Sequence, residues 1–444
     1  MKEQLQQLRQ SRRQLIPILL LLLTALYLHG ASLQNHLVNT NPRQTDQRGY
    51  INFARELRET NYHYLVPRNQ MPVYPLLQSL VYRPGMSEEE FFVVGKDLNI
   101  ILSLGILAIL YWLFQSYFSP LMTLNLMLIT GFTIFMFKAP FFQTELLFYL
   151  LNLAAFLLML SMFRKPAVKT GILTGLVFAV AHMTKASVSL GLILFILIMG
   201  AGILIDLFHH IPYKKVSRQK ALPISLSLLT FLVVISVYIS NSKAVYGHYF
   251  YNVNSTFYIW YDSWVEAKAG TTAHGDHTGW PDLPAEEIPG PFKYLREHTL
   301  SQIVNRVTTG LLRVLSNSIL SYGYFIYFLI YTLLFFTFSL LNWRRCLEII
   351  KAHFLLITFT AAYFIVYLLA VAWYTPIAKG NRFILAYFLP YMFVLFYVLR
   401  STDTYFGAQA SRLLNAINLI VLCMLTVHIY YIMTTTIGTF YGGL

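Results

Sequence analysis

The sequence predicts an all-α fold, a polytopic transmembrane helical bundle of about 11 spans that forms a single domain over residues 1–444. Hydrophobic residues make up 57% of the chain and charged residues only 12%, against about 25% charged residues in soluble globular domains. Long runs such as LIPILLLLLTALYL and LGLILFILIMGAGILI are almost free of charge, as a helix that crosses a bilayer requires. These runs are continuous rather than alternating, which excludes a β-barrel.

The individual spans follow from the apolar runs in order along the chain. The first is interpreted as an uncleaved helix rather than a signal peptide, because LHGASLQ matches a cleavage site only weakly. The run VFAVAHMTKASVSLGLILF is too long for one helix and is divided at TKAS. We therefore expect spanning helices at 15–33, 97–118, 120–138, 145–163, 169–184, 188–207, 221–241, 315–341, 352–373, 383–400 and 412–433.

The charge distribution predicts which ends of these helices face the cytoplasm. The N-terminal tail and the connections RKPAVK, YKKVSRQK and NWRRCLEIIK are short and basic, and positive charge marks the cytoplasmic side. We therefore expect a multi-pass protein of the plasma (inner) membrane with the N-terminus inside and two long extracytoplasmic loops, 34–96 and 241–316. The net charge of +14 indicates topology and contact with anionic membrane lipids rather than a nucleic-acid partner.

Asp46 opens the most informative part of the first long loop, the stretch TDQRGYINFARELRE. Tyr50, Ile51, Ala54 and Leu57 recur at helical spacing, so a short amphipathic helix is expected to begin after Asp46. One interpretation is that Asp46 only caps this helix, a role that aspartate favours. The other is that the carboxylate also accepts a proton at the membrane surface, and the two roles could coexist.

Further ionisable residues are expected at the outer ends of spans. Glu145 is the only acid between Asp97 and Asp206, and an ionisable residue at such a position is a candidate site residue. Lys138, Lys185 and Arg382 could each merely extend a charge to the interface. Together with the arginines of the first loop they could instead form an anion pocket, for which phosphate is a natural ligand. These arginines include Arg43, Arg48, Arg55, Arg58, Arg68 and Arg83.

Metal sites are not predicted from the sequence. His274, Asp276 and His277 form the stretch HGDH, whose spacing fits no established metal motif. Cys346 and Cys423 lie far apart and indicate neither a disulfide framework nor a metal site.

The first loop resembles that of the C-type integral-membrane glycosyltransferases, most closely the aminoarabinose transferases and the protein O-mannosyltransferases. In that superfamily an acid is followed by a helix of the form Tyr-x-x-x-Ala-Arg-x-Leu and by a proline-rich turn. Here these features are Asp46, the helix from Tyr50 to Leu57, and NQMPVYPLLQSLVY. A second acid opens a later span, as Glu145 does, and MTKAS and RFILAYFLP resemble two further motifs of the family.

The resemblance implies an inverting glycosyltransferase that uses a polyprenyl-phosphate-linked sugar as its donor and a lipid, glycan or protein as its acceptor. Asp46 would be the catalytic base, and Glu145 would orient the site or its substrates. Cations would stabilise the departing phosphate, and no cofactor is expected, although the two acids could instead share a divalent cation. The residues assigned to the phosphate are Arg43, Arg48, Lys138, Lys185 and Arg382, and those assigned to substrate positioning are Tyr50, Arg68 and Tyr74.

Departures from the family pattern leave the sugar and the acceptor open. Relatives often carry a second acid directly after the first, where this chain has Gln47, and the proline pair after Asn69 is split. A transporter or flippase of lipid-linked sugars is an alternative, although paired repeats and polar breaks near the membrane centre are typical of transporters. A ligase or polymerase of a lipid-linked glycan, or an inactive binding subunit, are further alternatives.

Overall fold

The computed structural model describes residues 2–63, 69–208, 217–274, 283–378, 380–401 and 408–438 of this chain. Within these ranges the structure is helical and contains no strand, and nine of its helices are long and apolar enough to cross a membrane. Two shorter apolar helices, α8 (Val168–His182) and α20 (Phe388–Leu399), accompany them. The predicted all-α class is therefore confirmed, while the number of spans and their orientation stay predictions.

The long helices lie close to the predicted spans, and their bounds are as follows. They are α1 (Lys2–Leu37), α4 (Glu88–Gln115), α5 (Pro120–Thr130) with η1 (Gly131–Phe135) and α6 (Met136–Lys138), α7 (Glu145–Arg164), η2 (Ala186–Val188) with α9 (Ser189–Phe208), α11 (Leu222–Tyr246), α16 (Tyr324–Leu341), α18 (Phe354–Tyr374) and α22 (Ala408–Tyr431) with η6 (Ile432–Thr436).

The remaining described helices connect these long ones. They are α2 (Gln47–Glu59), α3 (Val73–Ser79), α12 (Val253–Thr256), η4 (Tyr258–Trp260), α13 (Trp264–His274), α14 (Pro291–Glu297), α15 (Leu300–Ile319), α17 (Trp343–Ala352) and α19 (Arg382–Leu385), with a short π-helical turn, η3 (Ser217–Ala221), before α11.

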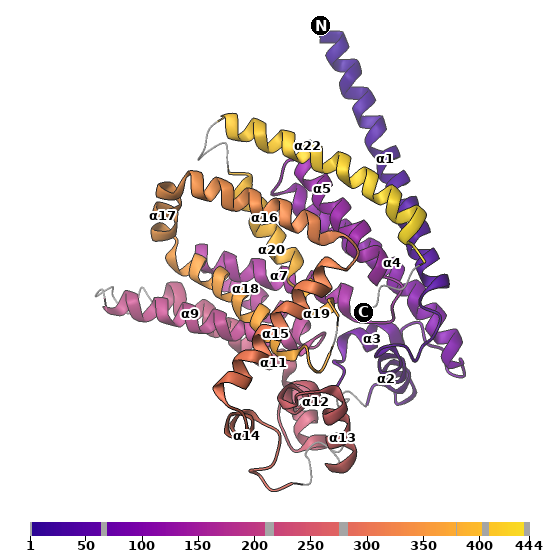
Figure 1. Ribbon diagram of the computed structural model, residues 1–444, viewed down its shortest axis with the longest axis vertical. Coiled ribbons are helices and arrows are strands. Elements are labelled where there is room, and N and C mark those ends of the chain that lie inside the picture. Colours follow the sequence, from indigo (N-terminus) through magenta and orange to yellow (C-terminus); the bar gives the residue numbers. More distant parts are fainter. Residues whose placement is uncertain are drawn as a thin grey trace.

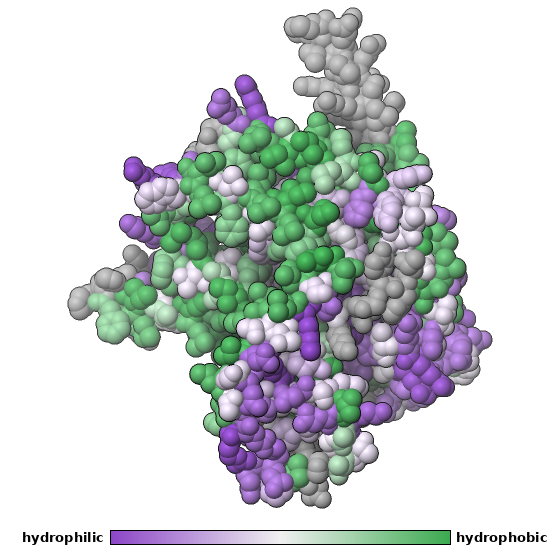
Figure 2. Space-filling model, in the orientation of Figure 1, coloured by the Kyte–Doolittle hydropathy of each residue, from purple (hydrophilic) through white to green (hydrophobic). Residues whose placement is uncertain are grey.

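The connecting helices gather at opposite ends of the bundle. Figure 1 shows α2, α3, α12, α13 and α14 toward the bottom of the molecule, whereas the N-terminus, α17 and the start of α22 lie at the opposite end. In Figure 2 a broad hydrophobic band crosses the middle, and hydrophilic residues gather below it over the α12 to α14 region. Such a band between two polar ends is what a protein embedded in a bilayer presents.

Several predicted boundaries differ from the structure: α1 is longer than the expected 15–33, and two further differences follow from a local signal. The helix expected at 97–118 already begins at Glu88, because Ser87 and Glu90 form a capping box in which each side chain bonds the other's backbone N–H. The span expected at 315–341 is two helices, α15 and α16. They are separated at Tyr322 and Gly323, whose positive φ angles of 37° and 79° do not fit a helix.

Close helix packing positions α8 against α11. Gly171 and Gly175 lie one turn apart on α8, and a methyl group on them would come within 2.3 Å of the carbonyl oxygen of Pro223 and 2.2 Å of that of Ser227. Glycine at this spacing lets two helix backbones approach in a membrane. This contact fixes the end of α8 and the residues after it, which include Lys185.

Candidate active site

Helix α2 forms as the apolar spacing predicts, but Asp46 does not cap it. Its buried face carries Tyr50, Ile51, Ala54 and Leu57. Asp46 occupies the N-cap position, yet its side chain makes no hydrogen bond to the N-terminal N–H groups of the helix. The capping interpretation of Asp46 is therefore wrong for the side chain, which is directed to other partners.

The carboxylate of Asp46 is held by Arg382, a residue 336 positions later. Nη1 of Arg382 lies 2.7 Å from Oδ1 and 2.8 Å from Oδ2 of Asp46. Arg382 opens α19, the short helix that precedes α20. The ion pair thus joins the first loop to the segment before the last two described apolar helices.

Gln143 is a second partner of Asp46 that the sequence analysis missed. Its Nε2 donates to Oδ1 of Asp46 and to Oγ1 of Thr45, both at 2.8 Å. Gln143 itself is only 3% exposed. Thr45 has a φ of 60°, an unfavourable conformation for a β-branched residue that must be held by its surroundings. Gln143 therefore constrains both the carboxylate and the backbone that carries it.

Glu145 and Lys185 form a second ion pair in the same region. Nζ of Lys185 lies 3.2 Å from Oε1 of Glu145, and the Glu145 side chain is only 4% exposed. Lys185 also lies 5.6 and 4.7 Å from the ring centroids of Phe148 and Phe383. Oε2 of Glu145 has no hydrogen-bond partner among the described residues. One oxygen of this carboxylate is therefore buried without a hydrogen bond to any described residue.

Lys138 lies behind this site rather than at its surface. The residue is buried, and in the described part of the chain its Nζ makes no hydrogen bond. Nζ lies 5.7 Å from the ring centroid of Tyr322 and interacts electrostatically with Glu145, Arg382, Lys185 and Asp46. Lys138 therefore acts on the site through its charge and does not reach the cavity described below.

The electrostatics keep both members of the Asp46–Arg382 pair ionised. Burial alone would raise the pKa of Asp46, but Arg382 and then Lys185 outweigh it, so this pKa is lowered from its usual value. Burial would lower the pKa of Arg382, but Asp46 and Glu145 raise it. Burial, followed by the charges of Asp46 and Glu145, raises the pKa of Tyr50 well above its usual value. Tyr50 is therefore a hydrogen-bond donor here and not a base.

Four of these side chains meet in a cavity of about 1380 Å³, namely Asp46, Glu145, Lys185 and Arg382. Volumes of roughly 300–1,000 Å³ suffice for drug-sized ligands. One arm of the cavity is apolar and runs between α9 and α11. Its lining includes Leu192, Ile193, Ile196, Leu228, Phe231 and Leu232.

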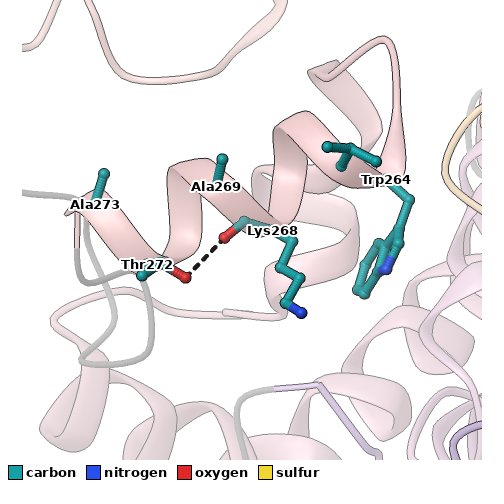
Figure 3. Close-up of a pocket in the computed structure, with 6 residues that line it drawn as sticks. Trp264, Lys268, Ala269, Thr272 and Ala273 are labelled. Carbon is teal, nitrogen blue, oxygen red and sulfur yellow. Dashed lines mark hydrogen bonds between the residues drawn. The ribbon is translucent and has the colours of Figure 1, made fainter.

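The opposite wall of the cavity comes from the second long loop. Tyr258, Trp264, Lys268 and Thr272 contribute to it. Figure 3 draws a separate, smaller pocket on α13 that shares Trp264, Lys268 and Thr272 with this cavity, and it shows Trp264 and Lys268 extending from the same side of the helix. Thr272 donates a hydrogen bond of 3.0 Å to the backbone oxygen of Lys268. The cavity thus has a charged centre between an apolar arm and a polar, aromatic wall.

The remaining predicted site residues are distributed differently. Tyr50 lines the cavity. Tyr74 is fully buried, and its ring packs edge-on against the ring of Tyr50, with 5.4 Å between the centroids. Arg43 is exposed, and Arg48 points to Glu88 of α4 at 3.6 Å, so neither lines the cavity. Helix α2 turns Arg48 away because its other face is the buried one. Arg68 lies outside the described residues.

Gln47, which replaces the second acid of the family pattern, is structural. Its Oε1 accepts hydrogen bonds of 2.8 Å from the Phe142 N–H and from Asn39 Nδ2, and its Nε2 donates to Asn39 Oδ1. The residue is completely buried. Gln47 therefore positions the 139–144 connection, and with it Gln143, relative to Asp46.

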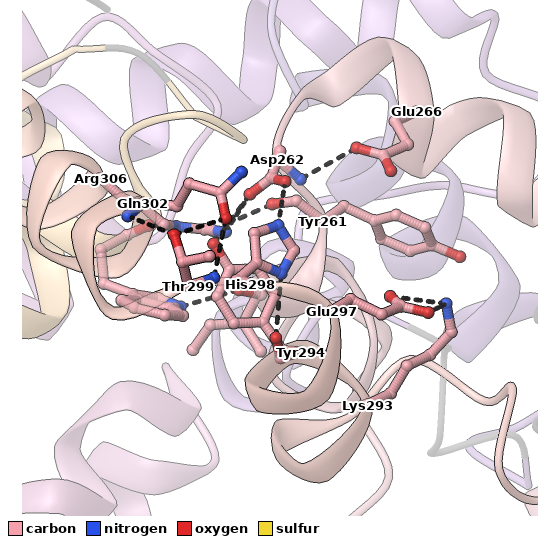
Figure 4. A network of polar contacts seen from close by, with 12 residues as sticks. Tyr261, Asp262, Glu266, Lys293, Tyr294, Glu297, His298, Thr299, Gln302 and Arg306 are labelled. Atoms are coloured by element: carbon pink, nitrogen blue, oxygen red, sulfur yellow. Dashed lines mark hydrogen bonds and ion pairs between the residues drawn. The ribbon is translucent and has the colours of Figure 1, made fainter.

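A second polar network lies in the second long loop, outside the cavity lining (Figure 4). Asp262 accepts hydrogen bonds from Tyr294 at 2.9 Å and from Arg306 at 2.8 Å, and His298 lies 2.8 Å from its other oxygen. Arg306 also lies 4.3 Å from the ring centroid of Trp373 on α18. The network fastens the 259–262 segment to α15 and α18.

The described part of the chain offers no cluster of typical metal ligands. No group of three or more His, Cys, Asp or Glu side chains there is arranged to hold a metal ion. Asp276 and His277 lie outside the described residues, as does the side chain of His274. The carboxylates of Asp46 and Glu145 are instead paired with the side chains of Arg382 and Lys185.

Comparisons with models of protein families, with curated proteins and with solved structures find no match for this chain.

Proposed function

We propose that the chain is a glycosyltransferase that moves a sugar from a polyprenyl-phosphate donor to an acceptor at the extracytoplasmic face of the membrane. The observation that carries the proposal is the cavity that joins two carboxylates and two cations to an apolar arm. A polyprenyl-phosphate sugar has matching parts, because it joins a polar sugar and an anionic phosphate to a long apolar tail. The resemblance of the first loop to the C-type glycosyltransferases supports the same conclusion.

The apolar arm suits the polyprenyl tail. Ile193, Leu228 and Leu232 line it and are also exposed at the surface of the bundle, with exposed fractions of 53%, 37% and 38%. A tail could pass from the surrounding lipid into this arm without meeting polar groups, because both environments are apolar. The phosphate would then lie beside Lys185 and Arg382.

The charged centre suits the reaction. The acceptor oxygen would attack the anomeric carbon as Asp46 takes its proton, and the bond from that carbon to the phosphate oxygen would break with inversion. The leaving phosphate gains negative charge, which Arg382 and Lys185 would stabilise. Glu145 would use its free oxygen to orient the sugar or the acceptor.

The positions of the charges favour transfer over transport. Glu145 is the first residue of α7, Lys185 lies between α8 and α9, and Arg382 opens α19. These are helix ends, whereas transporters typically place their substrate sites at broken helices near the membrane centre.

The topology part of the proposal has its own test. We propose a multi-pass plasma-membrane protein whose active site faces outward, because the basic connections alternate with those that carry the site. Cysteines placed in α2 and α13 should react with a membrane-impermeant reagent in intact cells, and a cysteine in α17 should not. Labelling of α17 alone would place the site on the wrong side.

The function is tested by turnover of the purified chain with a panel of polyprenyl-phosphate sugars. We expect a covalent glycoside with the anomeric configuration inverted relative to the donor. Lipid translocation without any covalent product would indicate the flippase alternative. Turnover restricted to oligosaccharide donors would indicate a ligase or polymerase.

A further inference from the structure

In the structure, Asp46 and Arg382 occupy hydrogen-bonding groups that each of them needs for its proposed role. Both carboxylate oxygens of Asp46 lie within 2.8 Å of the same nitrogen of Arg382. A base needs a free lone pair for the acceptor hydroxyl, and a guanidinium needs free N–H groups for a phosphate. While this contact remains, Nη1 of Arg382 is occupied by Asp46 and both oxygens of Asp46 are held by a cation, so the phosphate and the acceptor hydroxyl compete with the pair.

Unpaired polar atoms surround the pair. Within the part of the chain that the structure describes, Nε of Arg382, Oε2 of Glu145 and both side-chain polar atoms of Asn381 are buried without a hydrogen-bond partner. Leaving such groups unpaired is costly. Arg382 and Glu145 line the cavity, whereas Asn381 does not, so two of these unmet hydrogen-bonding groups belong to residues at which a ligand would bind.

Among the described residues, Gln143 is the hydrogen-bond partner of the Asp46 carboxylate that can remain when Arg382 leaves. Its Nε2 reaches Oδ1 of Asp46 at 2.8 Å, which leaves Oδ2 without a second donor once the arginine has moved. The amide is neutral, so it orients the carboxylate without the electrostatic effect of a full positive charge. The buried bonds of Gln47 hold the connection that carries Gln143.

We propose that the donor phosphate takes the Arg382 guanidinium away from Asp46, and that Gln143 then holds Asp46 as a base with Oδ2 free. This inference rests on the proposed function. In the transfer step the acceptor oxygen bonds to the anomeric carbon, and the bond from that carbon to the phosphate oxygen breaks with its electron pair on the phosphate. The acceptor proton moves to Oδ2 of Asp46. It passes to water when the lipid phosphate leaves and Arg382 returns.

The exchange predicts a pH dependence with a definite sign. Asp46 faces Arg382 on α19, Lys185 before α9, Glu145 on α7, Lys138 on α6 and Tyr50 on α2. Arg382 lowers the pKa of Asp46 in the free protein, so its loss to the phosphate raises that pKa in the complex. The acidic limb of kcat, which reports the complex, should therefore lie at higher pH than the acidic limb of kcat/KM.

Gln143→Ala tests the positioning role. We expect kcat to fall by about 10-fold to 100-fold, while the KM for the donor stays within about twofold because Gln143 does not contact the phosphate. A merely structural glutamine would change the melting temperature but not this division between kcat and KM. Equal changes in kcat and donor KM would remove Gln143 from the mechanism.

Binding of an unglycosylated polyprenyl phosphate in detergent tests the exchange without any transfer. Asp46→Asn removes the competitor for Arg382 and should tighten binding by about tenfold, whereas Arg382→Ala should weaken it. In the double variant the effect of Asp46→Asn should vanish, since the arginine for which it competes is absent. Asp262→Asn, which removes a carboxylate outside the cavity, should leave binding unchanged. If Arg382→Ala does not fold, Arg382→Lys takes its place.

The outcomes separate this inference from the proposed function. If Asp46→Asn weakens binding or leaves it unchanged, or tightens it equally without Arg382, the exchange is wrong even where the wild-type chain transfers sugar. If the binding cycle shows the predicted coupling but the wild-type chain forms no glycoside, the exchange stands and the proposed function is wrong.

Discussion

Asp46–Arg382 and Asp262–Arg306 are both carboxylate–guanidinium pairs, with shortest distances of 2.7 and 2.8 Å. They differ in what surrounds the arginine. All three nitrogens of Arg306 donate hydrogen bonds, to Asp262 and to the backbone oxygens of Ile259, Tyr261 and Trp373. Nε of Arg382 has no partner among the described residues, and a cavity lies beside it.

The hydrogen bonding of the arginine distinguishes a structural ion pair from a functional one. A fully bonded arginine such as Arg306 stabilises the chain segments that it joins. An arginine with an unused buried donor beside a cavity is poorly satisfied until a ligand arrives. We therefore assign the Asp262–Arg306 network to the stability of the second long loop and the Asp46–Arg382 pair to chemistry.

The largest expected effect separates the two aspartates by activity. Asp46→Asn should lower the transfer rate by about 10²-fold to 10⁴-fold, the usual contribution of a general base. Asp262→Asn should leave the rate within about threefold of the wild-type value because Asp262 does not line the cavity. Initial rates at saturating donor measure both effects, and equal losses in the two variants would abolish the distinction between the pairs.

Stability should separate the two arginines in the opposite order. Arg306→Ala removes the hydrogen bonds to Tyr261 O and Trp373 O and one of the two side-chain hydrogen bonds to Ile259 O, and should lower the free energy of unfolding by about 1–3 kcal/mol. Arg382→Ala should cost less, because Asp46 is 37% exposed and can be hydrated. Thermal unfolding in detergent measures this, with Arg296→Ala as control because, among the described residues, that guanidinium donates to the exposed carbonyl of Glu286 alone. A larger loss for Arg382→Ala would reverse the assignment.

Much of the fold was predictable from the sequence, because a spanning helix is encoded locally as a continuous apolar run. The divided run at TKAS is confirmed, with α8 ending at His182 and α9 beginning at Ser189. The error at 315–341 arose because apolar composition does not reveal the positive φ angles at Tyr322 and Gly323. The capping box of Ser87 and Glu90 is encoded locally in the sequence as Ser-x-x-Glu and marks the true start of α4.

The candidate site was predictable only as a set of residues and not as a set of contacts. The acids and cations at helix ends were identified by type, and the structure brings Asp46, Glu145, Lys185 and Arg382 together. No local pattern indicates that Asp46 pairs with a residue 336 positions away. One feature of the sequence could have indicated Gln143, namely that this polar residue stands between two phenylalanines and the acid in FFQTE.

Residues of the apolar arm allow a test that leaves all charges in place. Ile193→Trp should fill the arm beside α11 and raise the KM for a long-chain donor by about tenfold, because added volume in a packed space costs roughly 1–3 kcal/mol. Leu197→Trp lies on the same helix but does not line the cavity, so it should have no effect. A donor with a short prenyl chain should be insensitive to both changes, and an equal response of the two variants would place the tail elsewhere.

Acid titration should give the smallest effect and should concern the Asp262–Arg306 network. Burial would raise the pKa of Asp262, but hydrogen bonds from His298 and Tyr294 and the charges of His298 and Arg306 lower it. A lowered pKa means that the stabilisation is complete at neutral pH and is lost as the pH falls through that pKa. The melting-temperature difference between the wild type and Asp262→Asn should thus be constant above about pH 5 and shrink below about pH 4. A constant difference down to about pH 3 would contradict this.

The central claim is that the cavity beside Arg382 is where a lipid-linked phosphate binds. A structure of the chain with a polyprenyl phosphate bound tests it most directly. We predict the phosphate within hydrogen-bond distance of Arg382 and Lys185, with the prenyl chain between α9 and α11. A phosphate bound anywhere else, with the Asp46–Arg382 pair intact and the apolar arm empty, would contradict the account.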